Sequence, residues 1–289
     1  MSTVSVLVPI YNVEHYIERC SRSLFEQSYQ DLEFVFVNDC TPDNSIALLE
    51  QVINAYPERK ESVHIINHKK NRGLAATRNT GLENSQGEFV IFVDSDDWLD
   101  SRAIELLVKK QSETDSDIIS GNRIFYLENE ERFIEETHYV NKEQLTLQMM
   151  RHSWNHLLAG RLFRRSLFID NNLRWNEGLD VGEDRYMMTL VSYYANKYDL
   201  VDNVIYHYDK RNPHALTTTK SGRKILRNND QELKNVMILE QFFKGKEDSY
   251  QEECSKCVVH QMVYNYQNAL IYSSRDEYYK VVGLLDNRS

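Results

Sequence analysis

The chain has 289 residues, of which 34 are Lys or Arg and 44 are Asp or Glu, so its formal net charge at pH 7 is −10. An acidic chain is a poor non-specific binder of nucleic acids, because cationic side chains drive binding to the phosphate backbone. With only 4 Pro and 10 Gly, the composition excludes collagen and Pro-rich or Gly-rich linkers. The length fits about two domains, or one large α/β domain with an extension.

The four Cys residues do not predict a disulfide scaffold. Cys254 and Cys257 form a single Cys-x-x-Cys pair, which favours two ordinary helix thiols over a zinc or redox site. No basic segment followed by an apolar one opens the chain, so no signal peptide is predicted. No apolar stretch approaches the roughly 20 residues of a membrane-spanning helix. We therefore expect a soluble, cytoplasmic chain.

The first hundred residues alternate predicted strands with predicted helices. Four apolar, β-rich runs predict strands at residues 4–9, 33–37, 63–66 and 89–93. Three helices are predicted between them, at residues 13–27, 43–55 and 74–84. Asn12 is the predicted cap of the first helix. Continuously apolar strands that alternate with helices are typical of a parallel sheet covered on both faces.

The pattern is less regular after residue 115. Strands are predicted at residues 117–120 and 200–208, a Glu-rich hairpin at 125–140, and helices at 142–152 and 184–195. Long helical patterns dominate from Arg223 onward. The segment Lys220-Ser221-Gly222 is therefore the predicted boundary between a catalytic domain, residues 1–220, and a helical C-terminal extension, residues 221–289.

Polar side chains follow three of the four strands, at the sheet edge where ligands bind in open α/β folds. Tyr11 and Asn12 follow the first strand, and Asp39 follows the second. The run Asp94-Ser95-Asp96-Asp97 follows the fourth. Three carboxylates in four residues repel one another unless a cation lies between them, and oxygen ligands suit Mg²⁺ or Mn²⁺. A helix cap at Asp97 is the alternative, but capping accounts for only one of the three.

Two helix starts carry further charged residues. Arg72 and Arg78 flank a glycine at the start of a predicted helix, where a phosphate can meet both a helix N-terminus and a bidentate Arg; a solvated helix face is the alternative. Glu183 and Asp184 open a second helix. Either residue can be a cap that matches the helix dipole, or one of them can be a general base that faces the metal site.

Four segments together resemble family-2 glycosyltransferases of the GT-A fold, an α/β fold in which a mostly parallel, Rossmann-like sheet is flanked by helices. They are Val6–Asn12, Val37–Ser45, Asn71–Gly81 and Phe92–Leu99. The resemblance continues more loosely through residues 162–168, 182–184 and 205–208. Residues 221–289 carry no motif of the family that can be placed.

The resemblance implies an inverting, metal-dependent transfer of a hexosyl or N-acetylhexosaminyl group from a nucleotide-diphosphate donor to a hydroxyl of a glycan or lipid-linked acceptor. Residues 1–100 would form the nucleotide-binding half and residues 101–220 the acceptor half. Tyr11 would pack on the nucleobase, and Asp39 would accept a hydrogen bond from a ring N–H such as that of uracil, which favours a UDP-sugar. The full set implied to bind the nucleotide sugar is Pro9, Tyr11, Asn12, Asp39, Arg72, Arg78, Asp94, Ser95 and Asp96.

For the chemistry, the resemblance implies that Asp96 and Asp94 bind Mn²⁺ or Mg²⁺ and that Asp184 is the general base. His207 resembles a late histidine that completes the metal shell in many GT-A enzymes. His214 is the rival for that role, and a buried structural histidine is the alternative for either.

The chain departs from the family pattern after the second strand, where Asn38-Asp39-Cys40-Thr41 replaces the usual Asp-Asp-Gly-Ser. No Gln-x-x-Arg-Trp motif of processive synthases follows Asp184, so we expect addition of a single sugar. A dehalogenase-type phosphatase would have its Asp-x-Asp on the first strand, and a sugar-nucleotide pyrophosphorylase would have a Gly-rich loop there. A catalytically inactive nucleotide-binding relative that acts as an assembly partner is the remaining alternative.

The acceptor side of the site is the least determined. Four aromatic residues could stack on a sugar, although core packing is their more common role: Trp154, Trp175, Tyr193 and Tyr194. A basic group opens the extension, formed by Lys220, Arg223, Lys224 and Arg227. It is either a solvated helix face or a contact for anionic lipid heads at the inner face of the membrane. The apolar helices of the extension suggest a homodimer contact.

Overall fold

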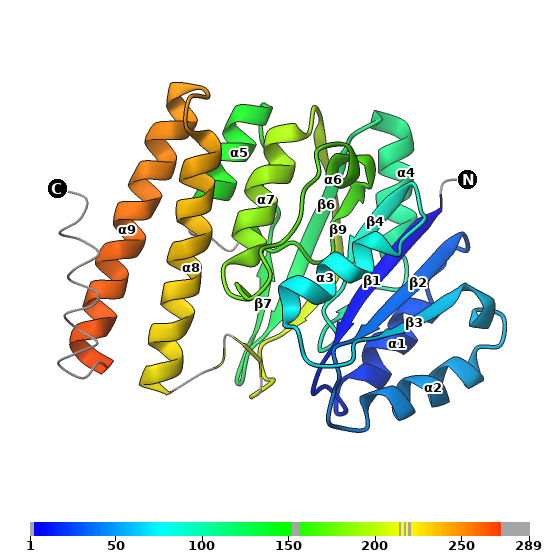
Figure 1. Ribbon diagram of the computed structural model, residues 1–289. Coiled ribbons are helices and arrows are strands. Elements are labelled where there is room, and N and C mark those ends of the chain that lie inside the picture. Colours follow the sequence, from blue (N-terminus) through cyan, green and yellow to red (C-terminus); the bar gives the residue numbers. More distant parts are fainter. Residues whose placement is uncertain (1–2, 152–155, 214, 217, 219–220, 273–289) are drawn as a thin grey trace.

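The computed structural model describes residues 3–151, 156–213, 215–216, 218 and 221–272. A nine-stranded sheet runs through this part of the chain in the order β3-β2-β1-β4-β8-β6-β9-β5, with β7 paired to β6. Helices lie on both faces of the sheet (Figure 1). The carboxyl ends of its first strands form the edge at which the predicted site residues lie.

The N-terminal half contains the predicted parallel strands. They are β1 (Val4–Ile10), β2 (Leu32–Asn38), β3 (Val63–Asn67) and β4 (Phe89–Phe92). The helices between them are α1 (Ile17–Phe25), α2 (Ser45–Ala55) and α3 (Leu74–Glu83), with a short 3-10 turn η1 (Lys60–Ser62) before β3. In the shared register Val6 lies opposite Phe34 of β2 and Ile91 of β4.

The start of α1 differs from its prediction. Asn12 does not cap the helix but has a left-handed φ of 56°, a conformation that Asn tolerates better than most residues. The next residues form a turn in which the amides of Tyr16 and Ile17 both donate to the carbonyl of Val13. The helix therefore begins at Ile17, four residues later than its apolar pattern indicates.

The C-terminal half mixes parallel and antiparallel pairing. Its elements are β5 (Trp98–Leu99), α4 (Ala103–Thr114), β6 (Ile118–Tyr126), β7 (Glu131–Ile134), α5 (Lys142–Met150), β8 (Leu162–Arg164), α6 (Ser166–Asp170), α7 (Glu183–Tyr194) and β9 (Tyr198–Asp209). β6 and β9 are parallel, whereas β8 runs antiparallel to both β4 and β6. The predicted strand at 117–120 and hairpin at 125–140 correspond to β6 and β7. The sequence pattern missed β5 and β8, which are too short to show a period.

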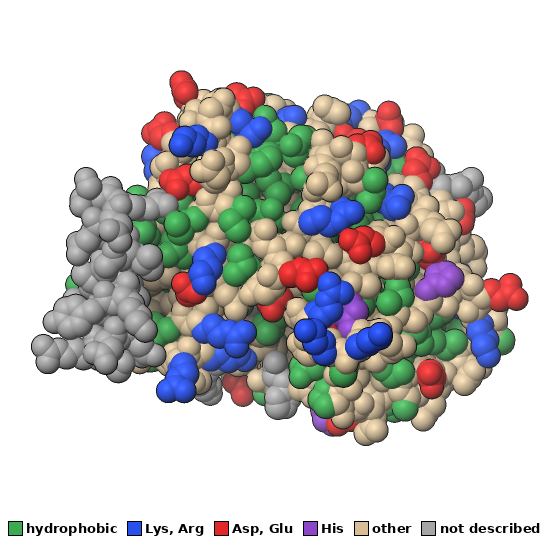
Figure 2. Space-filling model, in the orientation of Figure 1, with side chains coloured by type: hydrophobic (Ala, Val, Ile, Leu, Met, Phe, Trp, Pro, Cys, Tyr) green, Lys and Arg blue, Asp and Glu red, His purple; other side chains and the backbone are tan. Residues whose placement is uncertain are grey.

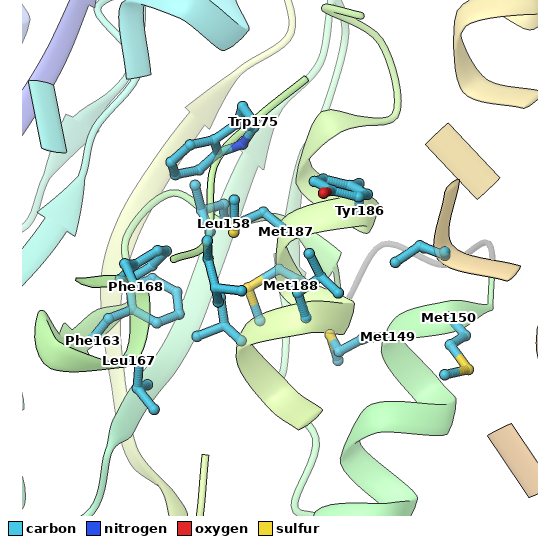
Figure 3. Close-up of a cluster of buried hydrophobic side chains, with 14 of the residues drawn as sticks. Met149, Met150, Leu158, Phe163, Leu167, Phe168, Trp175, Tyr186, Met187 and Met188 are labelled. Carbon is cyan, nitrogen blue, oxygen red and sulfur yellow. The ribbon is translucent and has the colours of Figure 1, made fainter. Parts of the chain in front are cut away.

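Two hydrophobic cores cover the two faces of the sheet. Side chains of α1, α2 and α4 pack on one face. The other face is covered by α3, α5, α6 and α7, together with α8 (Gly222–Phe243) and α9 (Asp248–Tyr272). Figure 3 shows the second core, in which Trp175 lies near Phe168 and Met187. Trp175 is 2% exposed, so its role is core packing; Tyr193 and Tyr194 pack partly buried against the same core, and Trp154 lies outside the described residues.

The two long helices of the predicted extension share this core with the elements that precede them. Leu233 and Phe243 of α8 and Val258 of α9 belong to the same buried cluster as Met187 of α7. Residues on both sides of the predicted boundary at 220/221 thus pack in one core, and the boundary stays a prediction. Cys257 is buried on α9 with its thiol 3.2 Å from the carbonyl oxygen of Met150. Over the described ranges, no helix combines the length and apolarity needed to cross a bilayer.

Candidate functional site

The loops after β1 and β2 meet at the carboxyl edge of the sheet. Pro9 lies opposite Val37 near the end of β1, and Tyr11 follows the strand with 48% of its surface exposed. The amide of Asn12 donates to the Thr41 hydroxyl at 2.8 Å, which joins the two loops. The left-handed φ of Asn12 turns the chain here, so Tyr11 presents an aromatic surface at the rim of the site.

Asp39 anchors a second loop beside this rim. It is 3% exposed, and its two oxygens accept from the amides of Arg72 and Gly73, each at 2.8 Å. His68 Nδ1 lies 2.7 Å from the same oxygen that binds Arg72. A carboxylate has about four acceptor positions, so one on Oδ2 is left after these three contacts. The side chain of Arg72 points elsewhere, to Glu177 Oε1 at 2.8 Å.

Arg78 is the centre of the site. It projects from α3, is 3% exposed, and contacts three carboxylates that are distant in the sequence. Nη2 lies 3.0 Å from Asp94 Oδ1, while Nη1 lies 3.0 Å from Glu183 Oε1 and also binds Asp184. Burial by itself lowers the pKa of Arg78, but the charges of Asp184 and Asp94 outweigh it and raise the pKa above its ordinary value. A permanently charged guanidinium thus joins the end of β4 to the start of α7.

Glu183 and Asp184 lie in the first turn of α7, but their surroundings differ. Asp184 is held on both sides, because its second oxygen accepts from the amide of Leu158 at 3.2 Å. Its side chain keeps 14% of its surface exposed. Burial and the charge of Asp184 raise the pKa of Glu183 to about 8, which favours its protonated form.

The acids of the Asp-rich loop after β4, residues 94–97, have different surroundings. Asp97 has no exposed surface, and it accepts from the Tyr206 hydroxyl at 2.6 Å and from the amide of Asp209 at 2.7 Å. It therefore ties the loop to β9 and its end. Asp96 accepts from Asn212 Nδ2 at 2.8 Å, and burial together with the charge of Asp94 raises its pKa to about 6. Ser95, between Asp94 and Asp96, is 5% exposed.

Asp94 and Asp96 fit a divalent cation. Burial raises the pKa of Asp96, and the negative charge of the neighbouring Asp94 raises it further. Mg²⁺ and similar ions are commonly bound by one or two carboxylates, with water and substrate phosphate in the remaining positions. Among residues that the structure describes, no cluster of three or more His, Cys, Asp or Glu side chains is arranged to hold a metal.

His207 lies in an aromatic stack. Its ring is parallel to that of Trp98 at a centroid distance of 5.0 Å, and Nδ1 lies 3.2 Å from the Tyr126 hydroxyl. These contacts account for its position on β9, and its metal role stays a prediction. His214, its rival, lies outside the described residues.

The sequence interpretation missed the support that α1 gives to the Asp-rich loop. Arg19 donates to the carbonyl of Asp96 at 2.6 Å, pairs with Asp209 at 2.9 Å, and lies 3.8 Å from the centre of the Trp98 ring. One and two turns later, Ser23 accepts from the amide of Leu99 and Gln27 donates to the carbonyl of Asp100. The signal was present as polar residues at a spacing of four, Arg19, Ser23 and Gln27.

A basic surface lies over the N-terminal turns of α8, where Figure 2 shows Lys and Arg side chains gathered. Arg223, Lys224 and Arg227 are exposed there. Within the described residues they form no ion pair. Lys220 lies outside the described residues.

The sequence is similar to a known protein family and to curated relatives. A family model described as "Glycosyl transferase family 2" matches residues 5–171. "Uncharacterized glycosyltransferase EpsJ" of Bacillus subtilis (strain 168) is 32% identical over 225 residues, which are 74% of this chain and 62% of that protein. "Glycosyltransferase GlyA" of Streptococcus pneumoniae is 32% identical over 223 residues, 71% of this chain and 30% of that protein. The chain thus spans less than two thirds of either relative.

Solved structures confirm the predicted fold class. Staphylococcus aureus TarS 1–349 in complex with UDP has a TM-score of 0.65 at 20% identity, covering 92% of this chain and 72% of that chain. The mannosyltransferase PcManGT from Pyrobaculum calidifontis in complex with GDP-Man and Mn²⁺ has a TM-score of 0.62 at 17% identity, covering 99% of this chain and 79% of that chain. At these identities the likeness concerns the fold, which is the α/β GT-A fold.

Proposed function

The chain belongs to glycosyltransferase family 2, and from this membership we propose that it transfers a single sugar, with inversion, from a UDP-sugar to a hydroxyl of a glycan or lipid-linked acceptor. The observation that carries the proposal is the contact of Asp94, Glu183 and Asp184 with one buried arginine at the carboxyl edge of the sheet. This arrangement brings the acids of the donor side within reach of a candidate base.

The donor base is assigned from Asp39 and Tyr11. One acceptor position on Asp39 Oδ2 is left for a ring N–H such as uracil N3–H, and exposed Tyr11 offers an aromatic surface on which the base can pack. The UDP in the TarS complex supports a uridine donor, and a second TarS structure in complex with UDP-GlcNAc supports a hexosyl or N-acetylhexosaminyl group. The GDP-Man and Mn²⁺ of the PcManGT complex make a guanosine donor the rival.

Asp94 and Asp96 would hold Mn²⁺ or Mg²⁺ at this site. A cation bound there neutralises the charge that develops on the departing diphosphate. The chain's own contribution is to keep both carboxylates in place: Arg78 holds Asp94, and Asn212 and Arg19 hold Asp96 through its side chain and its carbonyl.

Asp184 is the proposed general base. It would accept the proton of the acceptor hydroxyl while that oxygen attacks the anomeric carbon from the face opposite the diphosphate. The new bond to oxygen forms as the bond to the diphosphate breaks, which inverts the anomeric centre. Arg78 and the amide of Leu158 fix the two carboxylate oxygens, so the base keeps a defined orientation.

The acceptor proposal rests on the basic surface of α8. Arg223, Lys224 and Arg227 suit anionic lipid heads, so we propose a lipid-linked acceptor and peripheral contact of a cytoplasmic protein with the inner face of the membrane. Exposed apolar residues on α9, among them Val259, Val263 and Leu270, support the proposed homodimer contact. Sedimentation with anionic and neutral vesicles at low salt tests the first idea, and light scattering tests the second.

The first experiment is calorimetry with UDP, GDP, dTDP and CMP, each with and without Mn²⁺. We expect UDP to bind tightly only with the metal. A preference for GDP or dTDP would keep the reaction class and overturn the base assignment. Binding of none of the four would favour the inactive, assembly-partner relative.

The role of Asp184 is tested by Asp184→Asn, with Asp170→Asn as the exposed control on α6. Loss of a general base lowers turnover by about 10²–10⁴-fold, and release of UDP from the donor measures it. Affinity for UDP with Mn²⁺ should stay near that of the wild type. Near-normal turnover of Asp184→Asn would mean that another residue is the base.

A further inference from the structure

The segment 176–182, which leads into α7, makes contacts in two directions. One set reaches the start of α3, about a hundred residues earlier in the chain, and the other reaches α8. Asp180 takes part in both, and neither the sequence motifs nor the proposed reaction uses it.

Toward α3, Asp180 packs closely against residues 72–75, which we call the nucleotide loop because two of their amides bind Asp39. Its Oδ1 accepts from the amide of Ala75 at 2.9 Å, which satisfies one of the free amides in the first turn of α3. A Cβ on Gly73 would lie 2.4 Å from Asp180 Oδ2, so only glycine permits this approach. Gly73 and Arg72 are also the residues whose amides bind Asp39. Asp180 and Asp39 therefore hold the same short segment from two sides.

Toward α8, the backbone around Asp180 is held by buried amide side chains. The amide of Asp180 donates to Gln231 Oε1 at 2.8 Å, and Asn235 Nδ2 donates to the carbonyl of Val181 at 3.0 Å. Gln231 is 7% exposed and Asn235 is 1% exposed. At Gly182, a Cβ would lie 2.9 Å from Cγ of Glu232, so the helix also packs directly against the residue before Glu183. Figure 1 shows α8 beside α7 along this contact.

We propose that Asp180 is a positioning residue that ties the loop of the general base to the loop that holds Asp39, and that Gln231 and Asn235 hold this connection from α8. The proposal rests on the proposed function for the roles of Asp39 and Asp184. It gives α8, which lies beyond the residues matched by the family model, an indirect part in the reaction, through the loop that leads into α7. The base and the bound nucleotide must keep their relative positions, and a displacement of about 1 Å can cost roughly 10²-fold in rate.

The link to α3 is tested with Asp180→Ala and Asp180→Asn, against Asp170→Ala as a control. Asp180→Ala removes the acceptor for the Ala75 amide and loosens the start of α3. We expect affinity for UDP with Mn²⁺ to fall about fivefold, which corresponds to the typical loss of helix stability when a capping acceptor is removed. Asp180→Asn keeps an acceptor oxygen and should recover most of the loss. If Asp180 has only a structural role, Asp180→Ala should lower the melting temperature and leave affinity for UDP with Mn²⁺ unchanged. That result would contradict the proposal.

The link to α8 is tested with Gln231→Ala and Asn235→Ala, against Gln241→Ala, an exposed residue on the same helix. We expect kcat for hydrolysis of UDP-GlcNAc to fall about tenfold in both variants, while KM for this donor changes little. Gln231 and Asn235 hold the loop that precedes the proposed base, Asp184, and within the part of the chain that the structure describes they form no hydrogen bond with the nucleotide loop. Equal changes in kcat for Gln241→Ala, or none for Gln231→Ala and Asn235→Ala, would overturn the assignment.

Hydrogen exchange separates this inference from the donor assignment. In Asp180→Ala, amides of residues 72–75 and of 176–184 should both exchange faster than in the wild type, whether or not a nucleotide binds. Faster exchange in only one of the two segments contradicts the proposed tie. If the wild type binds none of the four nucleotides, the proposed function fails, and the exchange result still decides whether Asp180 joins the two loops.

Discussion

Asp96 and Asp97 are adjacent in the chain, yet their carboxylates have different surroundings. Asp97 is completely buried, and both of its oxygens accept hydrogen bonds from β9 and its end. Asp96 has one such bond, to Asn212, and a pKa raised to about 6 by burial and by Asp94. The pattern of three acids thus contains one structural residue, Asp97, and two for which we propose a metal-binding role, Asp94 and Asp96.

Substituting each acid by Ala should separate these roles. Asp97→Ala leaves the Tyr206 hydroxyl and the Asp209 amide without their acceptor, so we expect a loss of about 1–3 kcal/mol in the free energy of unfolding. Asp96→Ala should change stability little but remove the Mn²⁺-dependent part of UDP binding. Urea unfolding and calorimetry measure the two effects. Normal Mn²⁺-dependent binding by Asp96→Ala would exclude it as a ligand.

Glu183 predicts a pH dependence of stability. Its pKa rises from an ordinary 4.5 to about 8 in the folded chain, so the folded state keeps a proton that the unfolded state releases over this interval. The resulting stabilisation is complete below pH 4.5 and is lost as the pH rises through about 8. Glu183→Gln, which resembles the protonated form, should flatten this decline in urea unfolding across the interval. An unchanged decline would assign it to other groups.

At the scale of elements, the helices of this protein position loops as well as cover the sheet. Arg19 of α1 holds the Asp-rich loop, Ser23 of α1 and Gln27 just after it hold Leu99 and Asp100, and α3 presents the Asp39-binding amides at its start. The start of α3 depends on Gly73, which has a φ of 89° and lies against Asp180.

Gly73→Ala and Gly178→Ala form a matched pair for this element. Both glycines have positive φ, which costs another residue about 1–3 kcal/mol. Only Gly73 has a neighbour in the way, since nothing lies within 4 Å of a Cβ on Gly178. We expect both variants to lose stability and only Gly73→Ala to weaken UDP binding. Equal UDP affinities would show that the close approach to Asp180 is unimportant for the nucleotide loop.

At the scale of the whole molecule, a buried ion triad joins the C-terminal strands. Glu136 is 3% exposed and lies 2.9 Å from Arg123 of β6 and 3.0 Å from Arg161, which immediately precedes β8. Arg161 also donates to the carbonyl of Leu157, next to the residue whose amide holds Asp184. The triad therefore joins β6 to the start of β8 inside the protein.

Removing the charge of Glu136 should be costly. Glu136→Gln leaves two buried guanidinium groups without their counter-ion, and breaking a buried pair in this way costs about 3–5 kcal/mol in the free energy of unfolding. Its exposed neighbour provides the control, Glu135→Gln, which should be nearly neutral. Equal unfolding midpoints in urea would show that the triad does not stabilise the fold.

The periodic parts of the molecule were predictable because local pattern determines them. The apolar runs of β1 to β4 and the amphipathic pattern of α7 specified their own elements, and the order of motifs indicated the family and its GT-A fold. The short strands β5 and β8 could not be predicted, because two or three residues carry no period and pair only when the sheet is assembled. The late start of α1 likewise depends on the turn at Asn12.

The sequence by itself determined the fold class, the family and the identity of the acids at the strand ends, since these follow from local periodicity and from residue types at fixed spacing. Only the tertiary structure decided which acid meets which partner. Arg78 binds Asp94, Glu183 and Asp184, whereas Asp97 turns inward to Tyr206. It also joined α8 to the loop of Asp184 through Gln231 and Asn235. These contacts link residues far apart in the chain, so their energies depend on packing and burial that no local pattern encodes.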